Sequence, residues 1–383
     1  MVMLRTLFIS LIFITGLLKT DATPDLKLTK ITTSIESVRD QRVKGRGLDK
    51  IVDGDSKSYY WTGGQMQVGQ VVTFQFSQAI PIGKTVKIYT GLGIENREDD
   101  DSFRDAVLES SKDDAKTWQQ IATFHCGNAE VKAPFASSHY RIRVTKNSSY
   151  WGAIRHLTIS DNPLTQKTIT GATILNGKKY QLSATVDLEG YADLEKNLTK
   201  TTDLYVKVWP KIVQWLGANP DTAVRNIDIS LVNTLKHPAH ASGHTMTLLT
   251  KHLRNHPTDL EGVFVHELAH IIQAYPTYQP SWFVEGSADY VRYRQFPDRP
   301  WAKSARARMN NSKPLGHYWN SACFLLWMED TYKKPITATV SVALQQKKYK
   351  ETLFKELTGK SLEQLIELYK KSEYRPKLSS PEM

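Results

Sequence analysis

Two histidines four residues apart are the clearest chemical signal in the sequence. His266 and His270 flank Glu267 in a His-Glu-Leu-Ala-His segment, within an apolar stretch that predicts a buried helix. Helical residues four apart leave the same face one turn apart, so both imidazoles can bind one zinc ion. Glu267 lies beside them, where a carboxylate can act on a metal-bound water. Zinc would also remove the cost of burying three polar groups without partners.

A third ligand is expected from the next predicted helix, residues 281–292. Glu285 and Asp289 lie one turn apart on one face of this helix. Glu285 would complete a two-histidine, one-glutamate site and leave the fourth position for water. Asp289 would then accept the free ring N–H of a ligating histidine and fix its tautomer. The alternative is that Glu285 pairs with Arg292 or Arg294 on a solvated face.

Two local patterns add to this picture. Thr258 and Glu261 predict a capping box at the start of the first helix. A second histidine group, His237, His240 and His244, spans a loop-then-strand pattern that does not present the three rings on one face. We therefore expect these histidines in a loop beside the cleft, and not in another metal site.

Hydrophobic periodicity divides the chain into two regions. From about residue 30 to residue 160, short segments alternate apolar and polar residues between turn signals, which predicts a β-sandwich. Beyond this point, longer segments of 3.6-residue period are mixed with a few strands, as in an α+β domain. We expect a sandwich over residues 23–162, a linker at 163–170 and an α+β domain over 171–383.

The first 22 residues predict a secretory signal peptide. Arg5 precedes an apolar run of 12 residues, Leu7–Leu18, and small residues follow it. A transmembrane anchor would need roughly 20 apolar residues, and no later segment is apolar enough to span a bilayer. We expect a soluble protein that is secreted, or exported to a periplasm.

Composition excludes several classes of protein. Cys126 and Cys323 can form one bridge at most, which excludes a disulfide-stapled scaffold, and Cys323 lies in an apolar segment typical of a buried thiol. The formal net charge is +11, but no block of five or six Lys or Arg residues concentrates it. A solvated basic surface is therefore expected, without a specific nucleic-acid partner.

Pieces of the first region form a recurring pattern: Asp53-Gly54-Asp55 with Ser58 and Trp61, Leu108–Asp114 with Trp118, and Tyr140–Arg143 with Trp151. This pattern resembles a discoidin, or coagulation-factor type C, jelly-roll domain. Ser58 stands where that family usually has threonine, and Trp61 comes one residue late. The resemblance implies a module that binds carbohydrate or a cell surface, often beside a structural calcium.

Two sets of side chains would serve such a module. Asp53 and Asp55 offer hard oxygen ligands for calcium, although an Asp-Gly-Asp turn needs no ion. Aromatic residues could stack on a sugar ring or, alternatively, fill the sandwich core; these are Tyr59, Tyr60, Trp61 and Trp151.

The segments His266–His270 with Gln273, and Glu285–Arg292, together resemble the basic secretory protein family of zinc peptidases, within the gluzincin-like group. Gly243–Leu248 is similar to the family's edge strand, and Ser361–Leu365 with Tyr369 is similar to its last helix. The resemblance spans roughly residues 170–375. It implies a zincin-like fold, in which a twisted sheet packs on the active-site helices, and peptidase activity.

Related peptidases place a tyrosine near the developing oxyanion, which needs a donor besides zinc. Tyr318 is similar in position and opens a later predicted helix, with His317 as its rival. An ordinary core or surface tyrosine is the other alternative.

The sequence thus predicts a secreted zinc metallopeptidase with Glu267 as general base and a peptide or glycoprotein as substrate. Its N-terminal module would target it to a glycan or cell surface. The alternative is a non-catalytic secreted protein that binds carbohydrate or polyanions and holds a structural zinc.

Overall fold

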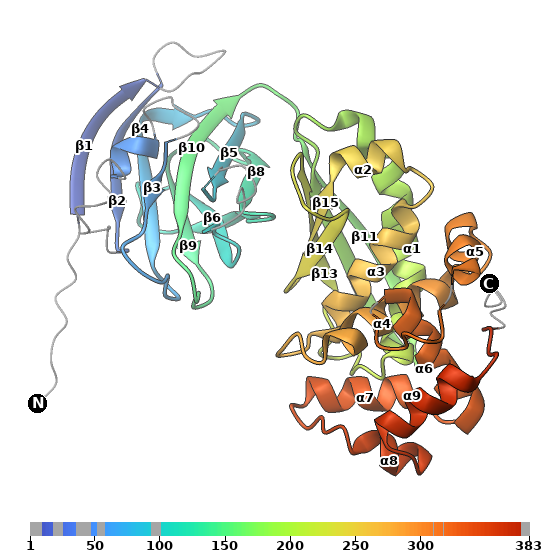
Figure 1. The fold of residues 1–383 in the computed structure, drawn as a ribbon. Coiled ribbons are helices and arrows are strands. Elements are labelled where there is room, and N and C mark those ends of the chain that lie inside the picture. Colours follow the sequence, from blue (N-terminus) through green and yellow to red (C-terminus); the bar gives the residue numbers. More distant parts are fainter. Residues whose placement is uncertain are drawn as a thin grey trace, which may run out of the picture. The chain divides into compact units, whose positions relative to one another are not determined.

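The computed structural model describes residues 10–17, 26–35, 47–51, 58–92, 101–308, 310–316 and 318–376. The chain divides into two compact units, residues 1–167 and 168–383 (Figure 1). The division falls within the segment that was expected as a linker, 163–170, although strand β11 already begins at Gln166. The predicted fold class, an all-β sandwich followed by an α+β unit, is confirmed.

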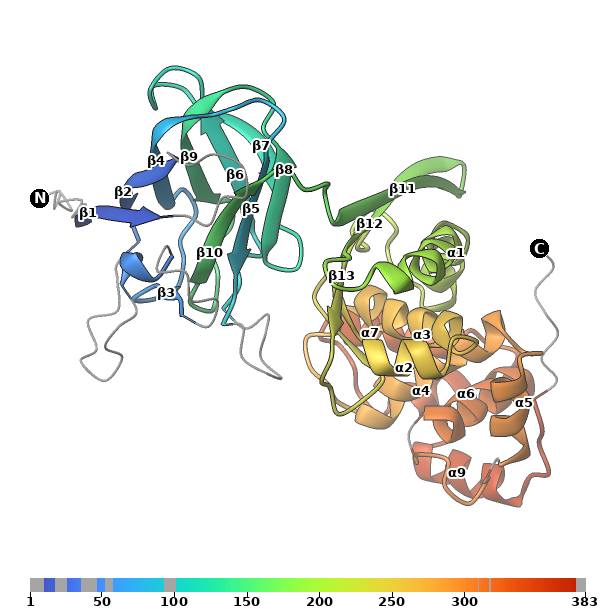
Figure 2. The ribbon, with the colours of Figure 1, turned by 90° about the horizontal axis from the view of Figure 1, so that it is seen from above.

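Two antiparallel sheets form the first unit, with strand orders β1-β2-β4-β9-β6-β7 and β3-β10-β5-β8. Val72, Phe74 and Phe76 of β4 are buried, and the residues between them are half-buried. Such alternation gives each sheet one apolar face, and the two faces share one core (Figure 2). The elements are β1 (Ser10–Leu17), β2 (Lys27–Thr33), η2 (Leu48–Ile51), β3 (Tyr60–Trp61), β4 (Val71–Ile80), β5 (Thr85–Thr90), β6 (Ala106–Ser111), β7 (Gln119–Thr123), β8 (Asn128–Lys132), β9 (Ser137–Val144) and β10 (Ala153–Ser160).

Part of the predicted signal segment is a strand in the full-length chain. Residues Ser10–Leu17 form β1, which pairs antiparallel with β2 at the edge of the larger sheet. Cleavage after residue 22 would leave β2 as the edge strand. The export signal therefore stays a prediction.

A five-stranded sheet of order β11-β12-β13-β15-β14 forms one layer of the second unit. Its strands are β11 (Gln166–Leu175), β12 (Lys178–Asp187), β13 (Asn226–Val232), β14 (Ala239–Ser242) and β15 (Thr245–Leu249). The expectation of an edge strand at residues 243–248 is wrong. β15 pairs on both sides, parallel to β13 and antiparallel to β14, so β14 is the edge strand at this end of the sheet and β11 is the edge strand at the other.

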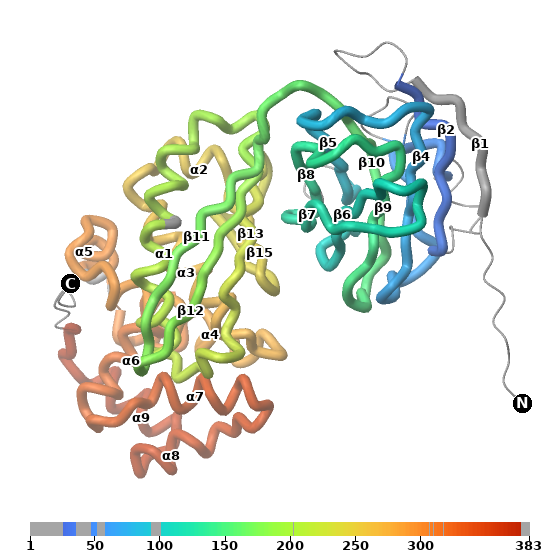
Figure 3. Tube along the Cα trace, turned by 180° about the vertical axis from the view of Figure 1, so that it is seen from behind, coloured from blue at the N-terminus to red at the C-terminus, as the bar shows by residue number. Residues whose placement is uncertain are grey.

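Helices form the rest of this unit, and α1 and α3 cover one face of the sheet (Figure 3). The helical elements are η3 (Ala192–Leu194), α1 (Glu195–Trp215), α2 (Thr250–Asn255), α3 (Leu260–Gln273), α4 (Ser281–Gln295), α5 (Pro300–Ala307), α6 (Tyr318–Tyr332), α7 (Ile336–Gln345), α8 (Leu353–Thr358) and α9 (Leu362–Lys371). Among the described residues, none of the helices is long and apolar enough to cross a bilayer. The segment that resembles the family's last helix lies in α9, which begins with a capping box between Ser361 and Gln364.

The capping box predicted at Thr258 and Glu261 is wrong. The N-cap of α3 is Asp259, which makes no side-chain capping bond. Its carboxylate instead pairs with Arg292 of α4, so a tertiary contact takes the group that could have capped the helix.

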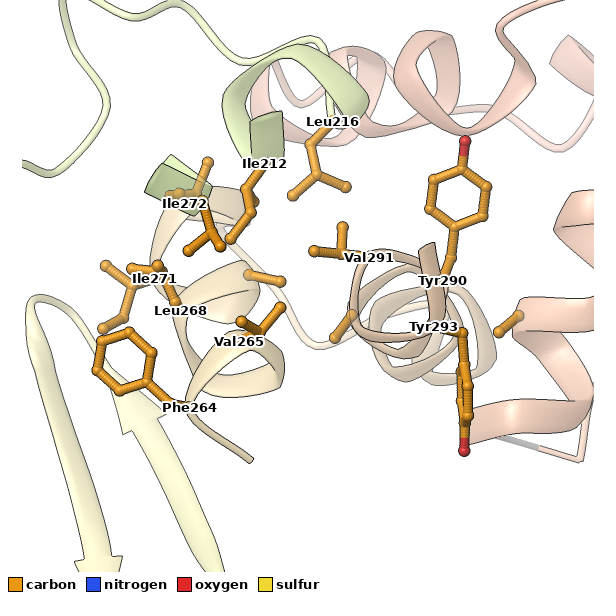
Figure 4. Packing of buried hydrophobic residues seen from close by; sticks show 14 of the residues in the cluster. Ile212, Leu216, Phe264, Val265, Leu268, Ile271, Ile272, Tyr290, Val291 and Tyr293 are labelled. Atoms are coloured by element: carbon orange, nitrogen blue, oxygen red, sulfur yellow. The ribbon is translucent and has the colours of Figure 1, made fainter. Parts of the chain in front are cut away.

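Helix α3 is buried on nearly every side. Val265, Leu268 and Ile272 pack near Val291 of α4 and Ile212 of α1 in the core of this unit (Figure 4). A polar side chain that this packing takes out of water therefore needs a protein partner or an ion.

Candidate metal centre

Three side chains from α3 and α4 converge on one point. The Nε2 atoms of His266 and His270 lie 3.1 Å apart. Glu285 Oε2 lies 3.3 Å from the first of these atoms and 3.6 Å from the second. Within the described part of the chain, these residues are the only group of three or more His, Cys, Asp or Glu residues whose ligand atoms all lie within 4.8 Å of one another. Glu285 is buried, so it does not lie on a solvated face, which was the alternative expectation.

The other ring nitrogens of the two histidines are occupied. His266 Nδ1 lies 2.8 Å from Asp289 Oδ1, and His270 Nδ1 lies 2.8 Å from Gln273 Oε1. A carboxylate or amide oxygen can only accept here, so both Nδ1 atoms donate. In its neutral form, each imidazole then has its lone pair on Nε2.

The orientation of the Gln273 amide supports this assignment. Its Nε2 donates to the Val284 carbonyl at 2.9 Å and to Ser287 Oγ at 2.8 Å, which turns Oε1 toward His270. Sequence reasoning used Gln273 only as part of a family pattern and missed this contact. The three-residue spacing from His270 was the available signal, because such residues are neighbours on a helix surface.

These donors fit a divalent transition metal ion. Two imidazole lone pairs and one carboxylate oxygen face each other within 3.6 Å. Such an arrangement is repulsive unless a cation or a proton lies among the three atoms. Two imidazoles and one carboxylate are a typical ligand set for zinc in an open site.

The electrostatics of the group also favour a positive charge at this point. Burial lowers the pKa of His266, but its contacts with Asp289 and Glu285 outweigh burial and raise this pKa to about 10. Burial raises the pKa of Glu285, yet hydrogen bonds from His266 and His270 hold it well below its usual range. Both shifts reflect the same attraction between positive charge at the imidazoles and the Glu285 carboxylate.

Two tyrosines flank the group. Tyr278, in the loop between α3 and α4, donates a hydrogen bond to Glu285 Oε1 and is 56 % exposed. Tyr318 begins α6, is 52 % exposed, and stacks its ring 6.1 Å from that of His266. Burial and the carboxylates nearby raise the pKa of Tyr318, so it keeps its proton. The rival donor, His317, lies outside the described residues.

Sequence reasoning did not find Tyr278. The residue lies seven positions before Glu285, in a segment without helical or strand periodicity. Its approach to the carboxylate depends on the path of this loop, for which no spacing rule exists.

A cleft of about 960 Å³ opens onto this group. Glu267 lines it, and within the described residues no hydrogen bond or ion pair uses the Glu267 carboxylate. His237, His240 and His244 also line the cleft, as expected, although residues 239–242 are the edge strand β14.

In the first unit, the structure separates the aromatic candidates. Tyr59 and Tyr60 are buried and cannot stack on a ligand, so the alternative of a core position holds for them. Trp61 and Trp151 are half-buried, with ring centroids 4.9 Å apart, and the Trp61 indole donates to Asp101 Oδ2 at 2.9 Å. The suggested calcium ligands Asp53 and Asp55 lie outside the described residues.

Residues 221–369 match a family described as a peptidase of plants and bacteria. The second unit therefore resembles a peptidase. This finding confirms the recognition of the family from the α3 and α4 segments, which lie inside the matched range. No protein of curated function matches the chain.

Carbohydrate-binding modules are among the solved structures similar to part of the chain. One is CpGH89CBM32-5 from Clostridium perfringens, in complex with GalNAc-β-1,3-galactose (14 % identity, TM-score 0.28, 36 % of this chain and 95 % of that chain). Another is the family 32 module of C. perfringens NanJ in complex with galactose (13 % identity, TM-score 0.26, 34 % and 92 %). A third is the family 32 module of Streptococcus pneumoniae EndoD (15 %, 0.26, 34 % and 96 %).

Replacing Gln273 tests whether its hydrogen bond with the His270 ring stabilises the protein. Gln273→Leu keeps the volume but leaves the His270 N–H and the Val284 carbonyl buried without this partner, so we expect a loss of about 2 kcal/mol in the free energy of unfolding. Urea denaturation of the metal-free protein measures this change in the free energy of unfolding. Gln345→Leu is the control, because this half-buried glutamine makes one 3.3 Å bond to the Ile272 carbonyl. Equal losses in the two variants would contradict a special role for Gln273.

Proposed function

We propose that this protein is an exported zinc metallopeptidase that hydrolyses peptide bonds in the cleft of its second unit. One observation supports this most strongly. The Nε2 atoms of His266 and His270, whose Nδ1 atoms contact Asp289 and Gln273, face one oxygen of Glu285 in an open cleft that Glu267 also lines. His266, His270 and Glu285 would hold the ion, while Asp289 and Gln273 fix the two rings.

When bound, zinc would act as a Lewis acid: it would polarise a peptide carbonyl and lower the pKa of the water that it binds to near 7. Glu267 then acts as general base: its carboxylate takes a proton from the attacking water and passes it to the leaving amine. The position of Glu267 suits this role, because it lies on α3 between the two histidines and faces the cleft.

The two tyrosines have different proposed tasks. Tyr318 keeps its proton and stacks beside His266, so its hydroxyl can donate to the carbonyl oxygen as negative charge develops there. Tyr278 donates to Oε1 of Glu285, which leaves Oε2 toward the histidines. It therefore orients a ligand.

The substrate is proposed to be a peptide or glycoprotein. The cleft is open, and β14, the edge strand of the sheet, lines it. An extended peptide can add to such an edge through main-chain hydrogen bonds.

The first unit is proposed to bind a glycan through Trp61 and Trp151. Their tilted rings form a half-buried aromatic surface, and Asp101 fixes the Trp61 indole. Aromatic faces of this kind stack on the apolar side of a sugar ring.

The predicted signal would export the protein, and sequencing the N-terminus of the exported chain tests whether it begins after residue 22.

Glu267→Gln tests the catalytic proposal. The variant keeps all three metal ligands, so we expect one zinc per chain by metal analysis, as in the wild type. Loss of the base should lower kcat/KM by about 10³-fold in a peptide-library digest. Glu261→Gln is the matched control, because this α3 glutamate is half-exposed and pairs with Arg299.

Cleavage retained by Glu267→Gln would refute the role of Glu267. A wild-type protein that binds one zinc but cleaves no peptide would favour the alternative, a non-catalytic binding protein with a structural site.

Trp151→Ala tests the glycan proposal. Removing one ring of the aromatic pair should weaken binding of the full chain on a glycan array by at least about tenfold, while cleavage of a small soluble peptide stays unchanged. Trp118→Ala is the control, because Trp118 stacks 4.3 Å from Arg141, away from the Trp61–Trp151 pair. Unchanged binding by Trp151→Ala, or an equal loss in both variants, would refute the proposed site.

A further inference from the structure

Charged side chains continue from the metal centre along α4. Asp289 Oδ1, which accepts the His266 ring N–H, also lies 3.9 Å from Arg292 Nη1. The other terminal nitrogen of Arg292 lies 2.5 Å from Asp259 Oδ1 at the start of α3. Basic and acidic groups thus alternate in a series of contacts that runs from His266 through Asp289 and Arg292 to Asp259.

Asp289 and Arg292, the two middle groups of this series, are little exposed to solvent. The Asp289 side chain is 4 % exposed and that of Arg292 is 18 % exposed. A buried carboxylate needs polar partners that replace its lost hydration and fix its position, and one imidazole N–H supplies little of this. The guanidinium adds a permanent positive charge close to the oxygen that holds His266.

Packing holds the guanidinium in this place independently of its ion pairs. The Arg292 guanidinium carbon lies 4.3 Å from the centre of the Trp301 ring. Gly262 of α3 lies against this pair. A Cβ at this position would lie 2.7 Å from Trp301 and 2.9 Å from Arg292 Nε. Both contacts are too short for a real methyl group, so glycine lets this pair lie against the α3 backbone.

We propose that Arg292 is a positioning residue of the metal centre. Its guanidinium holds the Asp289 carboxylate in place, so that the His266 ring stays oriented with Nε2 toward the ion. The inference rests on the proposed function, since it requires that His266 binds a metal. Partners of ligating histidines commonly change metal affinity about 10- to 100-fold when they are altered, and Arg292 acts one contact further away.

Zinc affinity of the full chain, measured by competition with a chromogenic chelator, tests this role. We expect Arg292→Met to weaken zinc binding about tenfold. Arg292→Lys should lose less, because it keeps the charge but not the planar fork. Gly262→Ala should also weaken binding, although it changes no charge, because its methyl group displaces the guanidinium.

Arg294→Met is the matched control. Arg294 lies on the same helix and pairs with Glu329 at 3.7 Å, so its loss should leave zinc affinity within about twofold. Cobalt substituted for zinc adds a spectroscopic readout. The visible bands should shift in Arg292→Met and stay unchanged in Arg294→Met, because they report on the ligand field at His266 and not on overall stability.

Wild-type zinc affinity and cobalt bands in Arg292→Met would overturn the inference and leave the proposed function in place. Failure of the wild-type protein to bind zinc would overturn the proposed function, and the inference with it. If Arg292→Met does not fold by circular dichroism, the folded Arg292→Lys and Gly262→Ala variants decide. Weaker zinc binding in them supports the role of Arg292, and unchanged binding refutes it.

Discussion

The proposed metal centre depends on two hydrogen bonds made on the far side of the histidine rings. Asp289 and Gln273 each accept from an Nδ1–H, which leaves an Nε2 lone pair on His266 and another on His270. With Glu285 on the third side, these lone pairs favour a cation. A change in either acceptor would alter the tautomers, and the same three residues would then no longer form a ligand set.

Burial of α3 explains why this arrangement persists. The helix packs among α1, α4 and the sheet, which fixes its backbone, and Asp289 and Gln273 hold the two histidine rings from behind. Glu267 differs from them, because its carboxylate faces the cleft and is used by no hydrogen bond or ion pair of the described residues. In the proposed mechanism, one helix thus presents two metal ligands and the general base side by side.

Expectations based on local spacing agreed with the structure more often than those that needed the path of the chain. The α9 segment is a helix with a local capping box, whereas the box expected at Thr258 is absent because Asp259 contacts Arg292, 33 residues away. Alternation did not reveal that Tyr59 and Tyr60 are both buried, since a period-two pattern does not say which neighbours cover each face. Similarly, strand order is a tertiary property, so β15 could not be distinguished from the edge strand β14.

The sequence by itself determined that His266, Glu267 and His270 share one stretch of helix, and that Glu285 and Asp289 share another. Both statements follow from the geometry of a single helix, which depends only on neighbouring residues. Only the tertiary structure decided that Glu285 turns to the Nε2 atoms, that Asp289 takes Nδ1, and that Tyr278 reaches Glu285. These contacts depend on how α3 packs against α4 and on the loop that joins them, and packing is set by the whole core at once.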